Sequence, residues 1–271
     1  MPRHVWFVDL LKKAYPTRYF AALLTNLPVI ENIANFGFFM GDDIVYLPKD
    51  TTIQINEGII EPEDIVLPSQ VVEHFIETAN YHWIMDFCLC REGAHCRDYP
   101  RDYGCIFLGE AVLGINPQLG RMVSKEEALK HARRCREAGL VHMIGRNKLD
   151  TMWLGVQPGG KLMTICNCCP CCCLWGTLPN ISPKISRKIQ KLPGVTVTVS
   201  HLCSGCGTCT EGVCFVGAIE LTNGRAEIKD TCRGCGRCVE ICPDGAISLT
   251  IDETTVFQKT VNRLSNLVDV T

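Results

Sequence analysis

The residues in this sequence best suited to chemistry are its 19 cysteines, which are unevenly distributed along the 271-residue chain. Six of the eight residues from Cys166 to Cys173 are cysteine, within the stretch ICNCCPCCCLW. Three kinds of structure use so many thiols: a disulfide network, a structural zinc site and an iron–sulfur centre. Thiolate is the soft ligand that selects iron–sulfur, zinc or copper(I). The redox compartment decides whether such thiols pair or bind metal.

The compartment is predicted to be reducing. The first residues, MPRHVWFVDLLKKAYP, lack the long apolar region and the cleavage site of a secretory signal. No run reaches the roughly 18 apolar residues of a membrane span. We therefore expect a cytoplasmic chain without a membrane span, whose cysteines bind metal. The net charge of −2 gives no overall reason to expect nucleic acid or an anionic membrane as a partner.

The C-terminal third contains a repeat of cysteine runs. The first copy begins CSGCGTCTEGVC at Cys203, and the second begins CRGCGRCVEIC 29 residues later, at Cys232. The spacing C-x2-C-x2-C lets three thiolates surround one cubic cluster, while a remote cysteine completes it. In the bacterial two-cluster arrangement, that fourth cysteine comes from the other run. The predicted ligands are Cys203, Cys206, Cys209 and Cys242 for one cluster, and Cys232, Cys235, Cys238 and Cys214 for the other.

This segment, about residues 194 to 252, resembles the bacterial two-cluster ferredoxins. The second run keeps the C-x3-C-P ending of these proteins, with Cys242 followed by Pro243. The first run has one extra residue before Cys214, and Phe215 stands where proline would be. The resemblance implies two [4Fe-4S] clusters that pass single electrons. Paired zinc sites are the alternative, although zinc modules arrange their cysteines two and two.

Ten further cysteines lie in two separate groups in the N-terminal part of the sequence. Consecutive residues of an extended chain point to opposite sides, so the run from Cys166 to Cys173 cannot pack against one core. We expect a third iron–sulfur cluster here, with zinc or redox-switchable thiols as alternatives. His82 and His95 are candidate nitrogen ligands. The candidate metal ligands are Cys88, Cys90, Cys96, Cys105, Cys166, Cys168, Cys169, Cys171, Cys172 and Cys173.

Four other residues bear on this predicted centre. Arg91, Arg97 and Arg101 lie near the first cysteine group, where their positive charge would stabilise a reduced cluster; Arg101 is expected to be exposed. Cys135 lies on the apolar face of a predicted helix and is expected to be a buried small hydrophobe rather than a ligand.

Helices and strands must position these groups, and the sequence predicts a mixture of both. A helix over 124–138 begins with the capping box of Ser124 and Glu127, and another over 69–79 has apolar residues at helical spacing, with Ser69 as its N-cap. Residues 42–56 predict a hairpin turning near residues 48–50. Strands are expected at 140–144, 151–156 and 161–169. A helix followed by a hairpin is typical of winged helices, but the acidic residues of the helix offset its arginines.

The expected fold class is α+β, in three parts. Residues 1–193 form a mixed α/β cysteine-rich domain with a helix–hairpin, winged-helix-like element. Residues 194–252 form a ferredoxin-like two-cluster domain, and residues 253–271 form a helical tail that folds back onto the first domain. The motifs CxCR at 88–91, GC…LG at 104–109, EAGLVH at 137–142 and ICNCC-x-CCC at 165–173 make the chain resemble an uncharacterised group of anaerobe 4Fe-4S dicluster proteins. That resemblance covers about residues 70 to 252 and implies an anaerobic redox role.

Three functions fit these features. The leading hypothesis is an iron–sulfur electron-transfer protein that relays single electrons between a redox partner protein and the N-terminal centre. The second is an anaerobic reductase, an oxidoreductase component whose active site is the N-terminal cluster. The third is a redox-sensing DNA-binding regulator. The sequence has no nucleotide-binding fingerprint, so flavin or nicotinamide would come from a partner.

Overall fold

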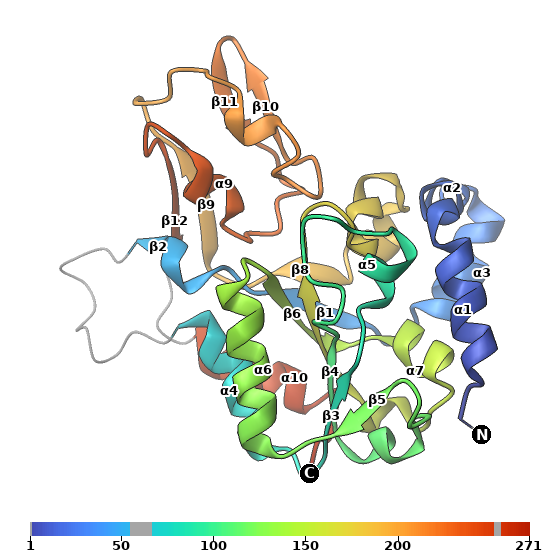
Figure 1. Ribbon diagram of the computed structural model, residues 1–271. Helices are drawn as coiled ribbons and strands as arrows, with labels where there is room; N and C mark the ends of the chain where they lie inside the picture. The colour runs from blue at the N-terminus through green and yellow to red at the C-terminus, as the bar shows by residue number, and fades with distance from the viewer. Residues whose placement is uncertain (1, 55–66, 252–255) are drawn as a thin grey trace.

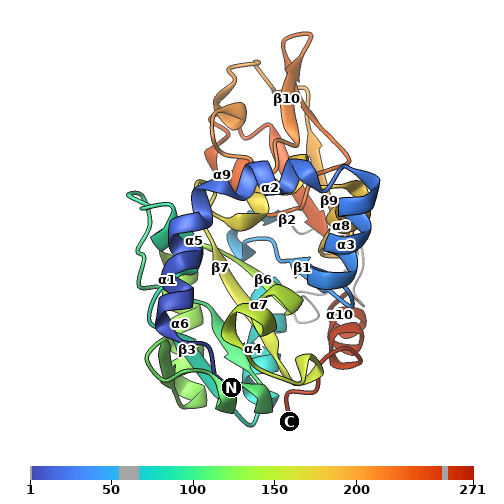
Figure 2. The same ribbon diagram turned by 90° about the vertical axis from the view of Figure 1, so that its right-hand side faces the viewer.

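The computed structural model describes residues 2–54, 67–251 and 256–271, and it has mixed α and β structure (Figure 1). A layered core holds most of the chain, and a smaller C-terminal unit of residues 195–251 projects from one end of it (Figures 1 and 2). The expected fold class is therefore confirmed. The predicted boundary at residues 252 and 253 lies outside the described residues.

The core is built on a seven-stranded sheet. All neighbouring strands are antiparallel except β1 and β8, which are parallel. Most strand residues are buried, as expected for a sheet that is covered on both faces. The strands, in spatial order, are β5 (Gly120–Met122), β3 (His82–Met85), β4 (Ile106–Leu108), β7 (Met163–Cys168), β6 (Val141–Arg146), β1 (Asp43–Tyr46) and β8 (Ile189–Lys191).

Helices cover both faces of this sheet (Figures 1 and 2). One face packs against α4 (Pro68–Thr78), α6 (Lys125–Glu137) and α10 (Val256–Ser265). The other face packs against α1 (Val5–Ala14), α2 (Arg18–Leu24), α3 (Pro28–Phe38) and α7 (Lys148–Leu154). Two short helices, α5 (Leu89–Gly93) and α8 (Pro183–Ser186), complete the core.

The C-terminal unit has a small sheet of its own, to which the N-terminal part of the chain adds a strand. Here β9 (Val195–Val199) pairs antiparallel with β12 (Ile247–Ile251), and β2 (Ile53–Gln54) pairs parallel with β12. A hairpin of β10 (Ile219–Thr222) and β11 (Arg225–Ile228) and the helix α9 (Arg237–Ile241) complete the unit. After it, α10 returns to the core and packs with α4. The predicted return of the tail is thus confirmed for residues 256–271.

Several local expectations need correction. Residues 151–156 do not form a strand, because α7 occupies most of them; the Asn147 side chain caps this helix, and Gly155 ends it at a φ of +73°. The predicted hairpin is wrong for its described residues 42–54, since β1 pairs with β6 and β8 while β2 joins the C-terminal unit; residues 55 and 56 lie outside the described residues. Ser69 lies inside α4, which begins at Pro68. The strands predicted at 140–144 and 161–169, after α6, exist as β6 and β7, but they lie in the middle of the large sheet and do not form a separate hairpin.

Exposed apolar side chains are concentrated on the N-terminal helices. Patches of this kind mark contacts with another protein or with a membrane surface. Among the described residues, no helix is both long and apolar enough to cross a bilayer. The large apolar residues of α1, α2 and α3 that are more than half exposed are Trp6, Leu10, Phe20, Leu23, Val29, Ile33 and Phe36.

A buried carboxyl group predicts how stability depends on pH. Asp42 is 7% exposed, and burial raises its pKa from 3.8 to about 7. The folded protein therefore holds this proton more tightly than the unfolded chain does, and the free energy of unfolding falls as pH rises from about 4 to 7. Asp42→Asn removes this dependence while keeping an acceptor for the Lys148 amide, which donates to Asp42 Oδ1 at 2.7 Å.

We expect the free energy of unfolding of Asp42→Asn, measured relative to that of the wild type, to rise by on the order of 2 kcal/mol from about pH 5.5 to pH 8. Thermal melts of the two anaerobic proteins across this range measure the difference. Val29→Ala, at an exposed position, changes no titratable group; it is the control and should show a constant difference. A constant difference for Asp42→Asn would contradict the prediction.

Candidate metal centres

The N-terminal thiols gather at one edge of the large sheet. Cys88 and Cys90 follow β3, Cys105 precedes β4, and Cys166 and Cys168 lie at the end of β7. Because β4 is antiparallel to both of its neighbours, the end of β3, the start of β4 and the end of β7 share one edge. The topology thus brings together the two cysteine groups that are far apart in the sequence.

The alternation of β7 then divides these thiols between two faces. Cys168 packs with Tyr46 and Met143 on one face of the sheet. Cys169 packs on the other side with Cys96 and Cys135. Successive side chains of a strand point to opposite faces, which confirms that the cysteine-rich run does not pack against a single core.

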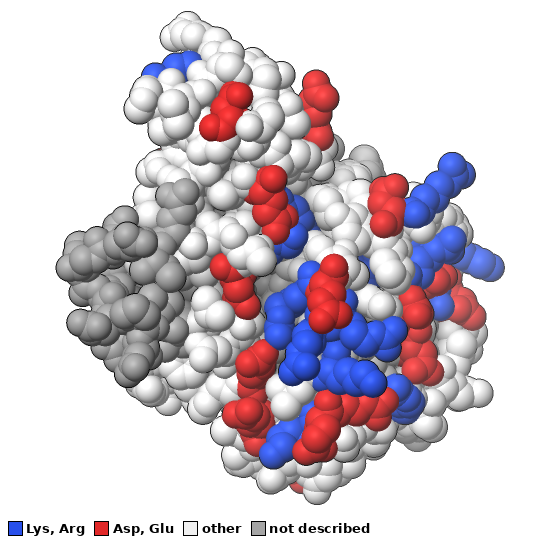
Figure 3. All heavy atoms as spheres, turned by 60° about the vertical axis from the view of Figure 1, so that its left-hand side comes forward, with Lys and Arg blue, Asp and Glu red and all other residues white. Residues whose placement is uncertain are grey.

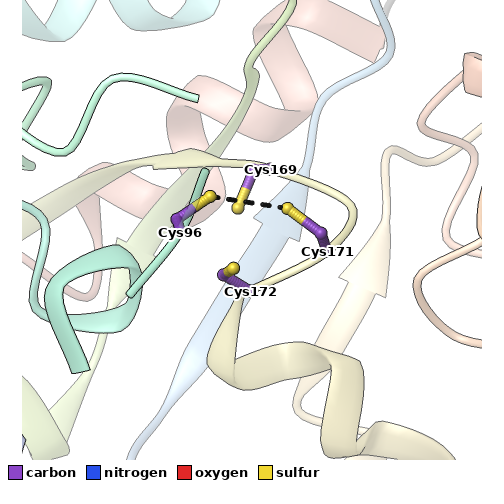
Figure 4. A group of neighbouring side chains, drawn as sticks. All are labelled: Cys96, Cys169, Cys171 and Cys172. Atoms are coloured by element: carbon purple, nitrogen blue, oxygen red, sulfur yellow. Dashed lines mark hydrogen bonds between the residues drawn. The ribbon is translucent and has the colours of Figure 1, made fainter. Parts of the chain in front are cut away.

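The first group holds four thiols in a compact cluster (Figure 4). Their sulfur atoms all lie within 4.8 Å of one another, and the Sγ atoms of Cys96 and Cys171 are 3.6 Å apart. Zn–S bonds of about 2.3 Å place the sulfurs of a tetrahedral zinc site about 3.8 Å apart. Cys171 is exposed and the other three are buried. The members of this four-thiol group are Cys96, Cys169, Cys171 and Cys172.

Arg91 holds the loop that carries Cys96. Its side chain is fully buried, and its guanidinium donates to the carbonyl oxygens of Pro100 at 2.7 Å, Asn167 at 2.7 Å and Tyr103. One side chain therefore joins the loop after α5 to the end of β7. The sequence suggested only a charge effect for this arginine, whereas the structure gives it a structural role. Arg97 and Arg101 are exposed, as was expected for Arg101.

The second group holds the six other thiols, and all six line one cavity of about 360 Å³. The Sγ atoms of Cys105 and Cys166 are 3.7 Å apart. The hydroxyl of Tyr46 lies 3.7 Å from the Sγ of Cys173 and 3.9 Å from that of Cys168. Burial raises the pKa of Tyr46, so this phenol stays protonated. The members of this six-thiol group are Cys88, Cys90, Cys105, Cys166, Cys168 and Cys173.

The candidate histidines belong to neither group. His82 is buried, with its Nε2 atom 2.6 Å from the carbonyl oxygen of Ile76. His95 is exposed.

The cysteines of the C-terminal unit also lie in two sets. All four thiols predicted for its first cluster, those of Cys203, Cys206, Cys209 and Cys242, line one small cavity. In the other set, burial raises the pKa of the Cys238 thiol, and the charges of Cys235, Cys232 and Cys214 raise it further. The fold therefore groups each remote cysteine with the three of the opposite run. The ligand assignments themselves stay predictions.

Comparison with known proteins identifies part of this unit. Residues 227–248, which carry the second cysteine run, match the family model of the 4Fe-4S binding domain. Residues 227–248 are therefore a ferredoxin-like iron–sulfur part, and the C-terminal unit that contains them is called the ferredoxin-like unit below. No curated protein and no solved structure matches the chain. Together with the clustered cysteines of the core, the match supports iron–sulfur electron transfer as the function.

An aromatic pair connects the ferredoxin-like unit to the six-thiol group. Phe215, the neighbour of Cys214, lies against Tyr46 with ring centroids 4.8 Å apart, and the Tyr46 hydroxyl reaches two of the six thiols. Cys214, Cys232 and Cys235 also pack against the core cluster that contains Cys168 and Cys173. The phenylalanine that replaces the ferredoxin proline is thus part of the contact between the two parts.

Cys135 is a matched control for the metal-binding cysteines. It is fully buried beside the four-thiol group but is not a member of it. Burial raises the pKa of its thiol to about 12, and its sulfur is not among the mutually close sulfur atoms of that group, so we assign it as a packed side chain and not as a ligand. We expect Cys135→Ala to keep the metal and sulfide content of the wild type and to lose about 1 kcal/mol of stability. Metal analysis and a thermal melt measure both, and loss of iron or zinc would contradict this assignment.

Proposed function

We propose that this protein is an iron–sulfur electron-transfer protein that relays single electrons between a redox partner and a centre in its N-terminal core. The ferredoxin-like unit holds two [4Fe-4S] clusters, the first bound by Cys203, Cys206, Cys209 and Cys242 and the second by Cys232, Cys235, Cys238 and Cys214. The observation that carries this proposal is the contact of the second set with the thiols of the core through Phe215 and Tyr46. That contact gives an electron on the second cluster a short path into the core.

The first cluster is the entry point for the partner. Its set of cysteines includes Cys206, which is exposed. Leu202 and Ile241, the neighbours of Cys203 and Cys242, are exposed apolar residues. An apolar rim around a partly exposed cluster suits a transient contact with a redox partner protein. The reducing interior of the cytoplasm is the compartment that keeps all these thiols available for metal.

The third centre lies at the four-thiol group, where Cys96, Cys169, Cys171 and Cys172 supply four soft donors. An iron–sulfur cluster bound there extends the relay by one redox step. The close spacing of the four sulfur atoms is that of a single tetrahedral ion, and they would have to move apart to hold a cubic cluster. A zinc ion there has no redox chemistry and would only fix the loop. Metal analysis separates the two.

A second candidate function is an anaerobic reductase. The observation that favours it is the cavity of about 360 Å³ beside the thiols, since substrate sites are concave and mostly apolar. In this function the ferredoxin-like unit supplies the electrons, and the substrate binds in the cavity.

The surface offers less support to a DNA-binding regulator. Figure 3 shows lysine and arginine gathered on one face, with aspartate and glutamate between them. Arg121 pairs with Glu127, and Arg136 pairs with Glu73 at 2.7 Å. Such paired charges leave a weak electrostatic footprint for phosphate.

The test is metal and sulfide analysis of the full chain, purified without oxygen, followed by low-temperature paramagnetic resonance on reduction. We expect about eight irons and eight sulfides from the ferredoxin-like unit, and further metal from the core. Reduction should produce the interacting signals of two neighbouring clusters. A protein with zinc alone, or without a paramagnetic signal on reduction, would overturn the proposed function.

A further inference from the structure

The relay just proposed places its core centre at the four-thiol group, whereas the contact through Phe215 and Tyr46 reaches the six-thiol group. We propose that Cys88, Cys90, Cys105, Cys166, Cys168 and Cys173 hold a second iron–sulfur cluster of the core, separate from the four-thiol group and larger than a single cube. This site goes beyond the proposed function, because the relay needs one core centre and the structure offers two sets of donors.

The two groups are distinct in space. The four-thiol group is defined by mutual sulfur distances within 4.8 Å, and none of the six other thiols belongs to it. The strand β7 separates them, since Cys168 and Cys169 pack in different core clusters. Cys169 also lines the cavity, so the two sites are neighbours that share a wall.

The cavity has room for a cluster. The cavity opens to the surface on one side and measures about 360 Å³. Its wall combines the thiols with apolar side chains, such as Leu11, Leu89 and Leu174, and with polar ones that include Arg18 and Asp150. An iron–sulfur cluster would fill the space and satisfy the six thiols together.

The number of donors sets the kind of cluster. One cube has four corners and takes four thiolates. Six thiols that converge on one cavity exceed that number by two, and all six are free rather than paired in disulfides. The chemistry that matches is a cluster of more than four irons, such as two cubes joined by a shared atom.

Buried positive charge surrounds the same site. Arg91 lines the cavity and is fully buried. Arg237 of the ferredoxin-like unit is 6% exposed and donates from Nη2 to the carbonyl oxygen of Cys168. Within the described part of the chain, its Nη1 atom is buried without a hydrogen-bond partner. A buried guanidinium requires a compensating negative charge, and a thiolate-ligated cluster supplies one.

The test compares two double variants of the full chain, each purified without oxygen. Cys105→Ala with Cys166→Ala removes two neighbouring donors of the six-thiol group. Cys96→Ala with Cys171→Ala does the same for the four-thiol group, and Cys135→Ala is the control. Iron, zinc and sulfide per chain and the Mössbauer spectrum are measured for each.

We expect the first double variant to lose about four irons or more and to keep the metal of the four-thiol group. The second should lose only the metal of its own group. An unchanged iron content in the first variant would overturn the proposal, as would the loss of one and the same signal in both variants. Either result leaves the signals of the ferredoxin-like unit in place, so it is distinguishable from failure of the proposed function.

A measurement on the wild type covers the case in which the first variant does not fold. Alkylation of the native anaerobic protein, read by mass spectrometry, should leave all six cysteines unmodified until the iron is removed by a chelator. Alkylation of Cys105, Cys166 or Cys173 at full iron content would overturn the proposal.

Discussion

Replacing Cys235 and Cys238 by alanine is expected to cut the electron path between the partner and the core. Both belong to the cysteine set that packs against the core thiols. Their loss should remove about four irons and leave the first cluster in place. Reduction of the core centre by a protein donor should then be at least about 100-fold slower, because a positioned intramolecular step is replaced by chance encounters. Stopped-flow absorbance under anaerobic conditions, with a limiting amount of donor, measures this rate.

The matched control is the replacement of Cys203 and Cys206 in the first set, which does not pack against the core thiols. This variant should also lose about four irons, but it keeps the second cluster. A small mediator that reaches the second cluster directly should reduce the core centre of this variant at the same rate as that of the wild type. If both double variants gave equal rates with both donors, the two clusters would not lie in series and the proposed path would be wrong.

Replacing Arg91 by leucine should have the largest effect on stability. The variant leaves the carbonyl oxygens of Pro100, Tyr103 and Asn167 without their donor in a buried site. Removing such a buried, hydrogen-bonded charged group lowers the free energy of unfolding by about 3–5 kcal/mol. The loop with Cys96 also loses its attachment to β7, so metal should be lost from the four-thiol group. Denaturant unfolding and metal analysis of the anaerobic protein measure the two effects.

Two further variants sharpen this prediction. Arg91→Lys keeps the charge but not the planar fork of donors, so it should recover only part of the lost stability. Arg97→Ala, at an exposed position of the same loop, should change stability by no more than about 0.5 kcal/mol. An Arg91→Leu protein within about 1 kcal/mol of the wild type would show that the three carbonyls find other donors.

The features that depend on local spacing were predictable from the sequence. The cysteine repeat that begins at Cys203 and Cys232 indicates the ferredoxin-like part, because three cysteines of each run are close together in the chain. The helix that starts after Ser124 was also predictable, since the Ser124 side chain accepts from the Glu127 amide at 3.2 Å. These signals need no knowledge of distant partners.

The partition of the ten core thiols was not predictable in this way. It follows from the order of β3, β4 and β7, which no local pattern specifies. The error over residues 151–156 was avoidable, because Asn147 and Gly155 are start and stop signals of a helix. The hairpin predicted over 42–56 is wrong for a reason that no local signal shows, since both of its strands pair with strands far away in the sequence.

The ferredoxin-like unit is held by the core on several sides. It begins just after β8, which belongs to the large sheet, it receives β2 as a third strand, and the chain beyond it returns to the core as α10. The Lys49 amide donates to the Cys235 carbonyl at 3.4 Å, and Arg233 donates to the Ser186 hydroxyl at 3.0 Å. A unit fastened in this way is not a diffusing shuttle. Electron passage from it into the core is therefore expected to be a first-order process, whose rate does not change when the protein is diluted and changes little with added salt.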